Sequence, residues 1–188
     1  MGHPVICKCG FVTLWHGDVF SLPNSRQVTD CYTFGHINQG ILFCGLFWRL
    51  ARRASLNWRA VAVAQSGVIW QVGENTERVL QRFRAVTIAL DYFGSSVLNS
   101  VSVSVFIMVA FVMARRFPVW MSVLLVLGTE VRRTVVVRDG LALNTLMLLY
   151  PIDAVRDRQM AGWRHQGRAQ GSTRAGRTCP VQSPNPMR

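Results

Sequence analysis

Polar side chains that could carry chemistry stand at the edges of the apolar blocks of this sequence. His36 and Gln39 are three residues apart, so a helix would place both on one face. Imidazole and carboxyl groups transfer protons, and guanidinium groups bind anions. The candidates for proton transfer are His36, Glu74 and Asp91. The candidates for ligand binding are Arg82, Arg84, Asn99, Arg138, Asp139 and Asn144.

The elements that would position these residues are five uncharged, largely apolar blocks. The two longest, 31–48 and 97–114, reach the roughly 17 residues that a helix needs to cross the hydrocarbon core of a bilayer. The shorter blocks 60–73, 117–129 and 140–152 would also fit buried helices or re-entrant segments. Blocks of this kind predict helices rather than strands.

The composition favours a membrane protein over an ordinary soluble globule. Charged residues make up 16% of the chain, whereas soluble domains carry about 25%. The mean hydropathy is +0.23, although the formal net charge is +12. Apolar blocks joined by basic connectors are typical of small multi-spanning membrane proteins. We therefore expect an all-α fold: a polytopic membrane helical bundle of about five transmembrane helices within residues 31–161.

The arginines distinguish the two sides of this expected bundle. Connectors 49–59 and 115–116 are basic and carry no acid, whereas 74–91 and 138–139 carry both signs. Basic connectors stay in the cytoplasm under the positive-inside rule. We therefore expect a membrane protein with a cytoplasmic C-terminus. An alternative has three spans and two interfacial helices.

The two ends of the chain lie outside the expected bundle. Residues 1–30 lack the basic start, apolar run and cleavage site of a secretory signal, yet the charges make them a non-cytoplasmic segment. They either translocate as a short tail or follow a span upstream of this reading frame. Residues 162–188 are rich in Gly, Arg, Gln, Ser and Pro, which predicts a disordered basic tail. Anionic membrane lipid is its expected partner, and nucleic acid is not, because aromatic residues do not interleave its charges.

The segment after residue 129 brings charge into an expected span. Glu130 and Arg133 are three residues apart and could pair on one helix, which would reduce the cost of burying them. Alternatively, the helix ends near Thr129.

No pattern indicates a metal or a cofactor, and we expect neither. Cys7 and Cys9 form a C-x-C pair, which lacks the spacing and partner pairs of structural zinc sites. Phosphate-binding loops, nucleophile elbows and dinucleotide fingerprints do not occur.

Several motifs resemble one known family. The most specific is Asp-Tyr-Phe-Gly-Ser-Ser-Val-Leu-Asn-Ser at 91–100, with Leu-Trp-His-Gly at 14–17 and Met-Leu-Leu-Tyr-Pro-Ile-Asp-Ala at 147–154. Over 1–161 the sequence resembles the uncharacterised bacterial family DUF2585, also called UPF0314. The resemblance implies a multi-pass inner-membrane protein, six-helical in the family, of unassigned activity. It also implies acidic residues at four positions that here are Gly67, Gln71, Ser95 and Val103, and a second histidine at Gln39.

These observations lead to one expectation with alternatives. We expect an integral inner-membrane protein of unknown molecular function with a polar pocket at its outer face. In the expected topology His36, Glu74 and Asn99 lie at similar depth, and we expect them to converge with Arg82 or Arg84. The alternatives are a membrane enzyme acting on a lipid or envelope head group, a ligand-binding or transport module, and a degenerate inactive copy. A plainer interpretation treats Ser and Asn as interhelical hydrogen-bonding groups, and Glu74 to Arg84 as a solvated amphipathic helix. The sequence decides neither enzymatic activity nor oligomeric state.

Overall fold

The computed structural model describes residues 4–7, 10–17, 24–86, 94–136, 141–150, 152–155 and 157. The elements in chain order are β1 (Trp15–His16), β2 (Thr29–Asp30), α1 (Thr33–Leu50), α2 (Leu56–Glu74), α3 (Glu77–Val86), α4 (Val97–Arg116), α5 (Val119–Val136) and α6 (Leu141–Leu149). The described part of the chain is thus mostly helical, as expected, and its two strands have two residues each.

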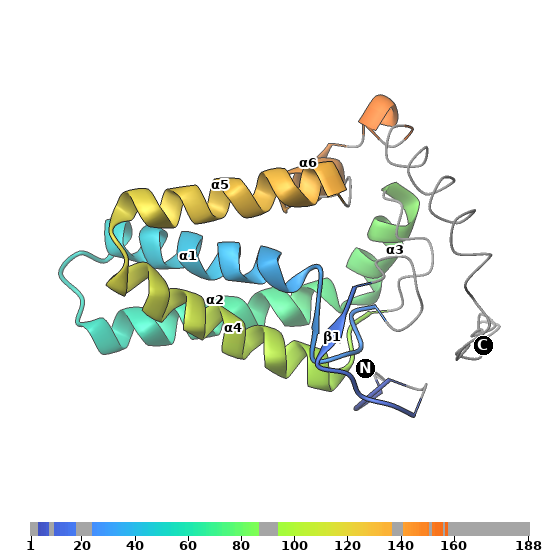
Figure 1. Cartoon of the computed structure of the whole chain (residues 1–188), viewed down its shortest axis with the longest axis horizontal. Helices are drawn as coiled ribbons and strands as arrows, with labels where there is room; N and C mark the ends of the chain where they lie inside the picture. Colours follow the sequence, from blue (N-terminus) through green and yellow to red (C-terminus); the bar gives the residue numbers. More distant parts are fainter. Residues whose placement is uncertain are drawn as a thin grey trace.

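Four long helices lie side by side in an elongated bundle, and α3 and α6 lie near one end of it (Figure 1). Helix α1 packs against α2, α4 and α5, and α2 also packs against α4. Helices α1 and α4 begin at the end of the bundle where α2 and α5 finish. This arrangement brings four helix termini from distant parts of the sequence to one end.

A small apolar core joins α2 to α4. Val63, Val103, Ile107 and Phe111 form it, and Phe43 and Phe47 of α1 pack against it. Helix α1 comes closest to α4 at Gly40, where a Cβ atom would lie 2.6 Å from the Ile107 carbonyl oxygen and 2.8 Å from the Ala110 Cβ. Glycine is therefore required at this position for the two backbones to approach.

Serine side chains begin two of the long helices. The Ser55 hydroxyl accepts a hydrogen bond from the Trp58 amide at 3.4 Å, and the Ser96 hydroxyl accepts one from the Asn99 amide at 3.1 Å. Both are N-caps, which satisfy amide groups that lack a partner in the first turn. Helix α2 consequently begins at Leu56, before Arg59, which is earlier than the uncharged block 60–73 indicates.

Helix α5 is longer than the uncharged block that predicts it. It continues past Thr129 through Glu130 and Arg133 to Val136, so the alternative in which the helix ends near Thr129 is wrong. The Arg133 Nη1 atom lies 3.9 Å from Glu130 Oε2, as the three-residue spacing predicts.

The two short helices, α3 and α6, differ from the expected five-span pattern. Helix α3 buries Leu80 and exposes Arg78 and Arg82, so the connector contains an amphipathic helix. It is shorter than the plainer interpretation has it, because Glu74 ends α2. Helix α6 has nine residues, or about 14 Å at 1.5 Å per residue, against a hydrocarbon core of roughly 30 Å. Within the described ranges, α4 alone is both long and apolar enough to cross a membrane by length and composition.

The segment before α1 folds onto the start of α4. We call its described residues, 4–7, 10–17 and 24–32, the N-terminal cap. The amides of Val97 and Leu98 donate to the carbonyl oxygens of Pro4 and Val5 at 3.1 and 3.0 Å. The Ser96 amide donates to the Ser25 carbonyl at 3.1 Å. The N-terminal cap therefore supplies acceptors that the first turn of a helix cannot find within itself.

The close approach at Gly40 can be tested by adding one methyl group. Gly40→Ala should lower the free energy of unfolding by about 1–3 kcal/mol, because its Cβ would overlap the α4 backbone. Gly45→Ala is the matched control on the same helix, since nothing lies within 4 Å of its added Cβ. Thermal unfolding followed by circular dichroism measures both. Equal melting temperatures for the two variants would contradict the packing described.

Candidate functional site

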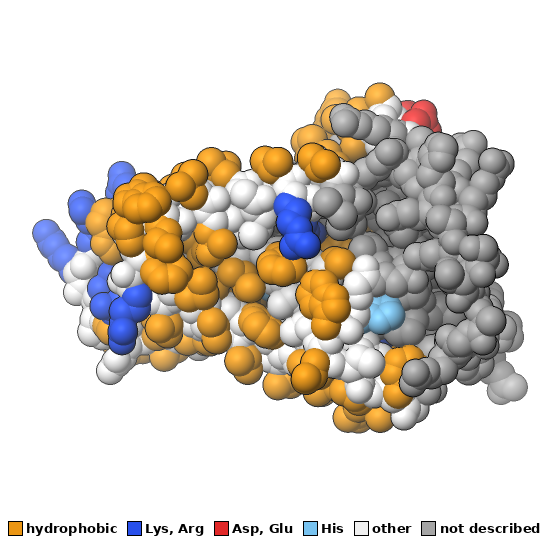
Figure 2. Space-filling view, in the orientation of Figure 1, with side chains coloured by type: hydrophobic (Ala, Val, Ile, Leu, Met, Phe, Trp, Pro, Cys, Tyr) orange, Lys and Arg blue, Asp and Glu red, His pale blue; other side chains and the backbone are white. Residues whose placement is uncertain are grey.

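Buried polar side chains gather at the end of the bundle where α1 and α4 begin, which we call the polar end. Those less than 9% exposed there are Ser25, Arg26, Gln27, Asp30, Thr33, Asn38, Gln39, Gln71, Asn75, Ser95, Ser96, Asn99 and Arg133. The opposite end, which we call the basic end, carries Arg49, Arg52, Arg53, Arg59, Arg115 and Arg116. Figure 2 shows the arginines of the basic end and the apolar side chains that cover the flank between the two ends.

One part of the polar end is a hydrogen-bonded junction between the N-terminal cap and α1. The buried Asp30 carboxylate accepts hydrogen bonds from the amides of Tyr32 and Thr33 through Oδ1, at 2.8 and 3.1 Å. Its Oδ2 atom accepts one from the Ser25 amide at 3.0 Å, and the Thr33 hydroxyl accepts one from the Asp30 amide at 3.0 Å. The Asp30 carboxylate therefore binds three backbone donors, two of them at the start of α1.

Asn99 joins α4 to the N-terminal cap. Its Nδ2 atom donates to the Gln27 carbonyl oxygen at 2.9 Å, and the Ser96 hydroxyl donates to the Arg26 carbonyl at 3.2 Å. The fully buried Gln27 side chain in turn accepts a hydrogen bond from the Thr13 amide at 2.7 Å. The sequence predicted Asn99 as a ligand-binding residue. In the structure its side-chain amide hydrogen-bonds the start of α4 to the N-terminal cap.

The end of α2 forms a second polar connection. Gln71 donates from Nε2 to Glu74 Oε2 at 3.3 Å, and Asn75 donates from Nδ2 to the Gln71 carbonyl at 2.8 Å. The Asn75 Oδ1 atom accepts a hydrogen bond from the Ser95 amide at 2.8 Å. Glu74 thus lies half-buried in a network that fixes α2 to the segment before α4.

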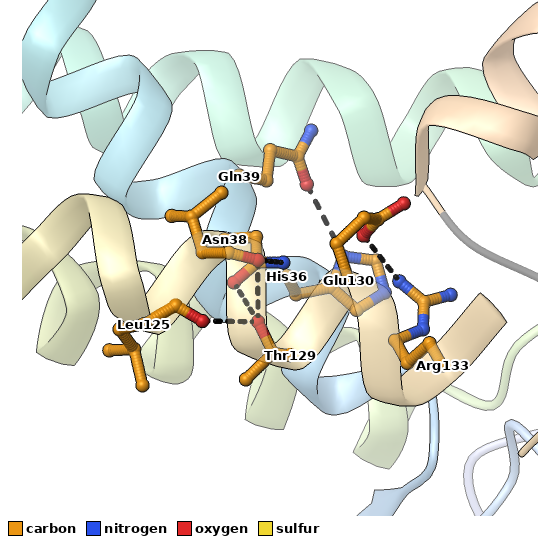
Figure 3. Close-up of polar contacts among 8 residues, drawn as sticks. His36, Asn38, Gln39, Leu125, Thr129, Glu130 and Arg133 are labelled. Atoms are coloured by element: carbon orange, nitrogen blue, oxygen red, sulfur yellow. Dashed lines mark hydrogen bonds and ion pairs between the residues drawn. The ribbon is translucent and has the colours of Figure 1, made fainter. Parts of the chain in front are cut away.

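The third part lies between α1 and α5 and is drawn in Figure 3. We call it the α1–α5 cluster, and it consists of His36, Asn38, Gln39, Thr129, Glu130 and Arg133. The Thr129 hydroxyl lies 2.7 Å from Asn38 Oδ1 and 2.7 Å from the Leu125 carbonyl oxygen. Its single hydrogen can be donated to only one of them at a time. Asn38 is 1% exposed, so this hydrogen bond forms away from water.

Arg133 is the charged centre of the α1–α5 cluster. Its side chain is 6% exposed, and its guanidinium carbon lies 5.4 Å from the centre of the Tyr32 ring. The guanidinium packs so closely on the backbone of Gly35 that a Cβ atom there would overlap Nη1. The neighbouring His36 places Nδ1 3.3 Å from Gln39 Oε1 (Figure 3). The cluster thus combines an imidazole, a guanidinium and a carboxylate beside the first turns of α1.

The structure brings the sequence-predicted residues together only in part. His36, Glu74 and Asn99 all stand at the polar end, but each hydrogen-bonds to a different partner, namely Gln39, Gln71 and Gln27. The exposed Arg82 donates from Nε to the Leu148 carbonyl at 3.3 Å, so it joins α3 to α6. Their convergence on one pocket stays a prediction.

The other predicted residues are described partly or not at all. Arg84 and Asn144 lie on α3 and α6, and only their backbone is described. Asp91, Arg138 and Asp139 lie outside the described residues. Among the described residues, no group of three or more His, Cys, Asp and Glu side chains could hold a metal ion.

Sequence reasoning did not include Arg133 among the site residues. It treated Arg133 only as a partner that offsets the charge of Glu130 within a span. The available signal was a charged pair inside an otherwise apolar stretch, since such residues usually face a protein interior.

The positions that the resemblance associates with acidic residues are all buried in this chain. Gly67 packs against Ile107, whose Cδ1 atom would lie 2.9 Å from an added Cβ. Val103 is 1% exposed and belongs to the apolar core, whereas Gln71 and Ser95 belong to the polar connection at the end of α2. The facing sides of α2 and α4 are therefore apolar over much of their length.

The fold and the buried polar end define a helical bundle whose two ends differ in chemistry. Residues 1–161 match the family described as "Protein of unknown function (DUF2585)". The chain is 46% identical over 161 residues to a UPF0314 protein of Paracoccus denitrificans, covering 86% of this chain and 83% of that protein. It is 42% identical over 163 residues to a UPF0314 protein of Sphingopyxis alaskensis, covering 86% of each. The chain therefore belongs to the DUF2585 family, and the resemblance is confirmed. No solved structure matches it.

The hydrogen bond between Thr129 and Asn38 can be tested with an isosteric change. Thr129→Val should lower the free energy of unfolding by about 1–3 kcal/mol, because it leaves the buried Asn38 amide without its donor. Thr134→Val on the same helix is the control, since Thr134 is exposed. Thermal unfolding of both variants gives the comparison, and an unchanged melting temperature for Thr129→Val would contradict a structural role for this bond.

Proposed function

We propose that this chain is an integral protein of the bacterial inner membrane, with the basic end in the cytoplasm and the polar end at the outer face. We further propose that the polar end binds a ligand. The observation that carries the proposal is the order of surfaces along the bundle: arginines at one end, exposed apolar flanks, and a buried polar layer at the other end.

The apolar flanks support the membrane placement. Helix α4 exposes a stripe of valines spaced by three or four residues, which therefore lie on one face. They are Val97, Val101, Val105, Val109 and Val112, each 44–58% exposed. Only 28% of the apolar window of α4 is buried within the chain. A face of this kind is unfavourable in water and favourable against lipid.

Helix α5 presents a similar surface. Its exposed residues include Val119, Val123, Leu124, Leu127, Val131 and Val135. Helices α1, α2 and α5 have 18, 19 and 18 residues, and α4 has 20, so each exceeds the roughly 17 residues needed to cross a bilayer. We propose that these four helices are the spans.

Aromatic residues support the position of the basic end at a membrane surface. Trp48, Trp58 and Trp120 stand at helix ends there and are 52–71% exposed. The guanidinium carbon of Arg52 lies 4.6 Å from the centre of the Trp48 ring. Tryptophan is enriched at the level of lipid head groups, and arginine on the cytoplasmic side.

A disulfide supports the outward orientation of the polar end. Cys7 in the N-terminal cap is buried and disulfide-bonded, with a partner outside the described residues. Disulfides persist in the periplasm and are rare in the cytosol. The N-terminal cap covers the start of α4, so both would lie on the periplasmic side.

An enzyme that acts on a lipid or envelope head group is the second candidate function. It is favoured by His36, which is partly buried and directly follows Gly35, on whose backbone the Arg133 guanidinium packs. An imidazole next to a guanidinium could transfer a proton while the anionic group is held. Turnover of purified lipid extracts by the full chain distinguishes this candidate from binding alone.

The proposed topology makes a prediction for reporter fusions. Alkaline phosphatase should be inactive when fused after Arg53 or Arg116, and active when fused near Thr76, because the arginine-rich connectors remain in the cytoplasm. A cytoplasmic C-terminal tail, as the sequence predicts, requires the chain to cross the membrane once more after α5. A fusion after Arg158 tests this additional crossing. The protein should remain in the membrane fraction after alkaline extraction and should be solubilised by detergent. An active fusion after Arg53 would overturn the orientation, and release by alkali would overturn the integral placement.

A further inference from the structure

We propose that Arg133 is the anchor of a binding site for the phosphodiester of a glycerophospholipid at the junction of α1 and α5. The inference rests on the proposed membrane placement and names the ligand of the polar end. The proposed ligand would supply acceptors to Arg133, which is buried with two donor atoms that lack a hydrogen-bond acceptor in the described part of the chain.

Arg133 is incompletely partnered in the described part of the chain. Its Nε and Nη1 atoms are shielded from solvent and have no hydrogen-bond acceptor there. The contact from Nη1 to Glu130 Oε2 is 3.9 Å, which is an ion pair but exceeds hydrogen-bond length. A buried charged donor without an acceptor is costly, so the guanidinium gains free energy from any oxyanion that reaches it.

The geometry of the guanidinium selects an oxyanion. Each bidentate edge of the planar guanidinium pairs Nη2 with either Nε or Nη1, so two oxygens of a phosphate or a carboxylate on either edge would supply an acceptor to one of the two unpartnered atoms. Gly35 leaves the room that lets this fork lie against the first turn of α1. Because the Glu130 contact is long, a phosphodiester could replace Glu130 as the closest anionic partner without breaking a short hydrogen bond.

The surroundings of Arg133 favour a lipid over a free anion. The next residue, Arg132, is exposed, and its guanidinium carbon lies 5.5 Å from the centre of the Phe34 ring. Phe34 also meets the half-exposed Trp15 edge to face, with ring centres 6.0 Å apart. Tryptophan is enriched at head-group level, so the half-exposed Trp15 agrees with this position. The exposed apolar side chains of α5, including Val131 and Val135, would then lie along the acyl chains.

The position along the helix agrees with the level of a phosphate. Arg133 lies one turn before the end of α5 at Val136, and it faces the first turn of α1. In the proposed topology this level is where the hydrocarbon core gives way to the outer head groups. A phospholipid could therefore place its phosphodiester at Arg133 while its acyl chains remain in the bilayer.

The test uses the purified full chain in a detergent without phosphate, with bound lipid counted by native mass spectrometry. Phosphatidylglycerol and phosphatidylethanolamine should both bind at one saturable site, since both carry the phosphodiester. Diacylglycerol and inorganic phosphate should not bind there. Diacylglycerol binding as tight as that of the phospholipids would overturn the role of the phosphate. Tight binding of inorganic phosphate would show a free-anion site and overturn the lipid assignment.

Substitutions of the two adjacent arginines provide the matched comparison. Arg133→Gln should weaken phosphatidylglycerol binding by about tenfold or more, the loss expected for a charge-assisted hydrogen bond. Arg132→Gln removes the same charge from an exposed neighbour and should change the affinity far less. If Arg133→Gln does not fold, Arg133→Lys keeps the charge without the fork and should bind weakly while melting near the parent. Equal losses from the two positions, or none at Arg133, would overturn the proposal.

The failure of this inference is distinguishable from the failure of the proposed function. Neither arginine substitution should alter the reporter fusions or the resistance to alkaline extraction. A chain that is integral to the membrane but binds phospholipid equally well after Arg133→Gln would refute only the lipid site. A chain that alkali releases would refute both.

Discussion

The rest of the structure depends on hydrogen bonding at the start of α4. Three successive amides, from Ser96 to Leu98, donate to carbonyl oxygens of the N-terminal cap, and the Asn99 side chain adds a fourth bond. These bonds hold the N-terminal cap over the helix that carries most of the apolar core. The same cap contains Asp30, whose carboxylate binds the amides of Tyr32 and Thr33 at the start of α1. The two central helices are thus set side by side by one short, irregular segment.

The long helices could be predicted because their interiors are uncharged. The boundaries of the blocks 31–48 and 97–114 differ from those of α1 and α4 by no more than two residues. The sequence left two alternatives for the end of α5, because the environment that tolerates Arg133 is supplied by α1, from a distant part of the chain. The N-terminal cap was also beyond sequence reasoning. The sequence predicted only a non-cytoplasmic segment, because the partners of its residues lie about 70 to 90 residues away along the chain.

The candidate site divides in the same way. The sequence predicts that polar groups from separate blocks lie at one end of the bundle, because alternating helices return their ends to the same side. It could not assign partners, since Asn99 and Glu74 are occupied by Gln27 and Gln71. Arg133 was missed because a charge late in an apolar segment indicates a helix end as readily as a buried site. The structure shows that the guanidinium is enclosed, because it packs directly on the backbone of Gly35.

The bonds between the N-terminal cap and α4 also set an order of events during synthesis. Pro4 and Val5 leave the ribosome before Val97 and Leu98, whose amides bind their carbonyl oxygens and which follow about 90 residues later. At roughly 5–20 residues per second, Pro4 and Val5 wait about 5 to 20 seconds for these partners. During that interval their carbonyl groups lack the α4 amides, and a chaperone or protease could reach this segment before α4 is synthesised.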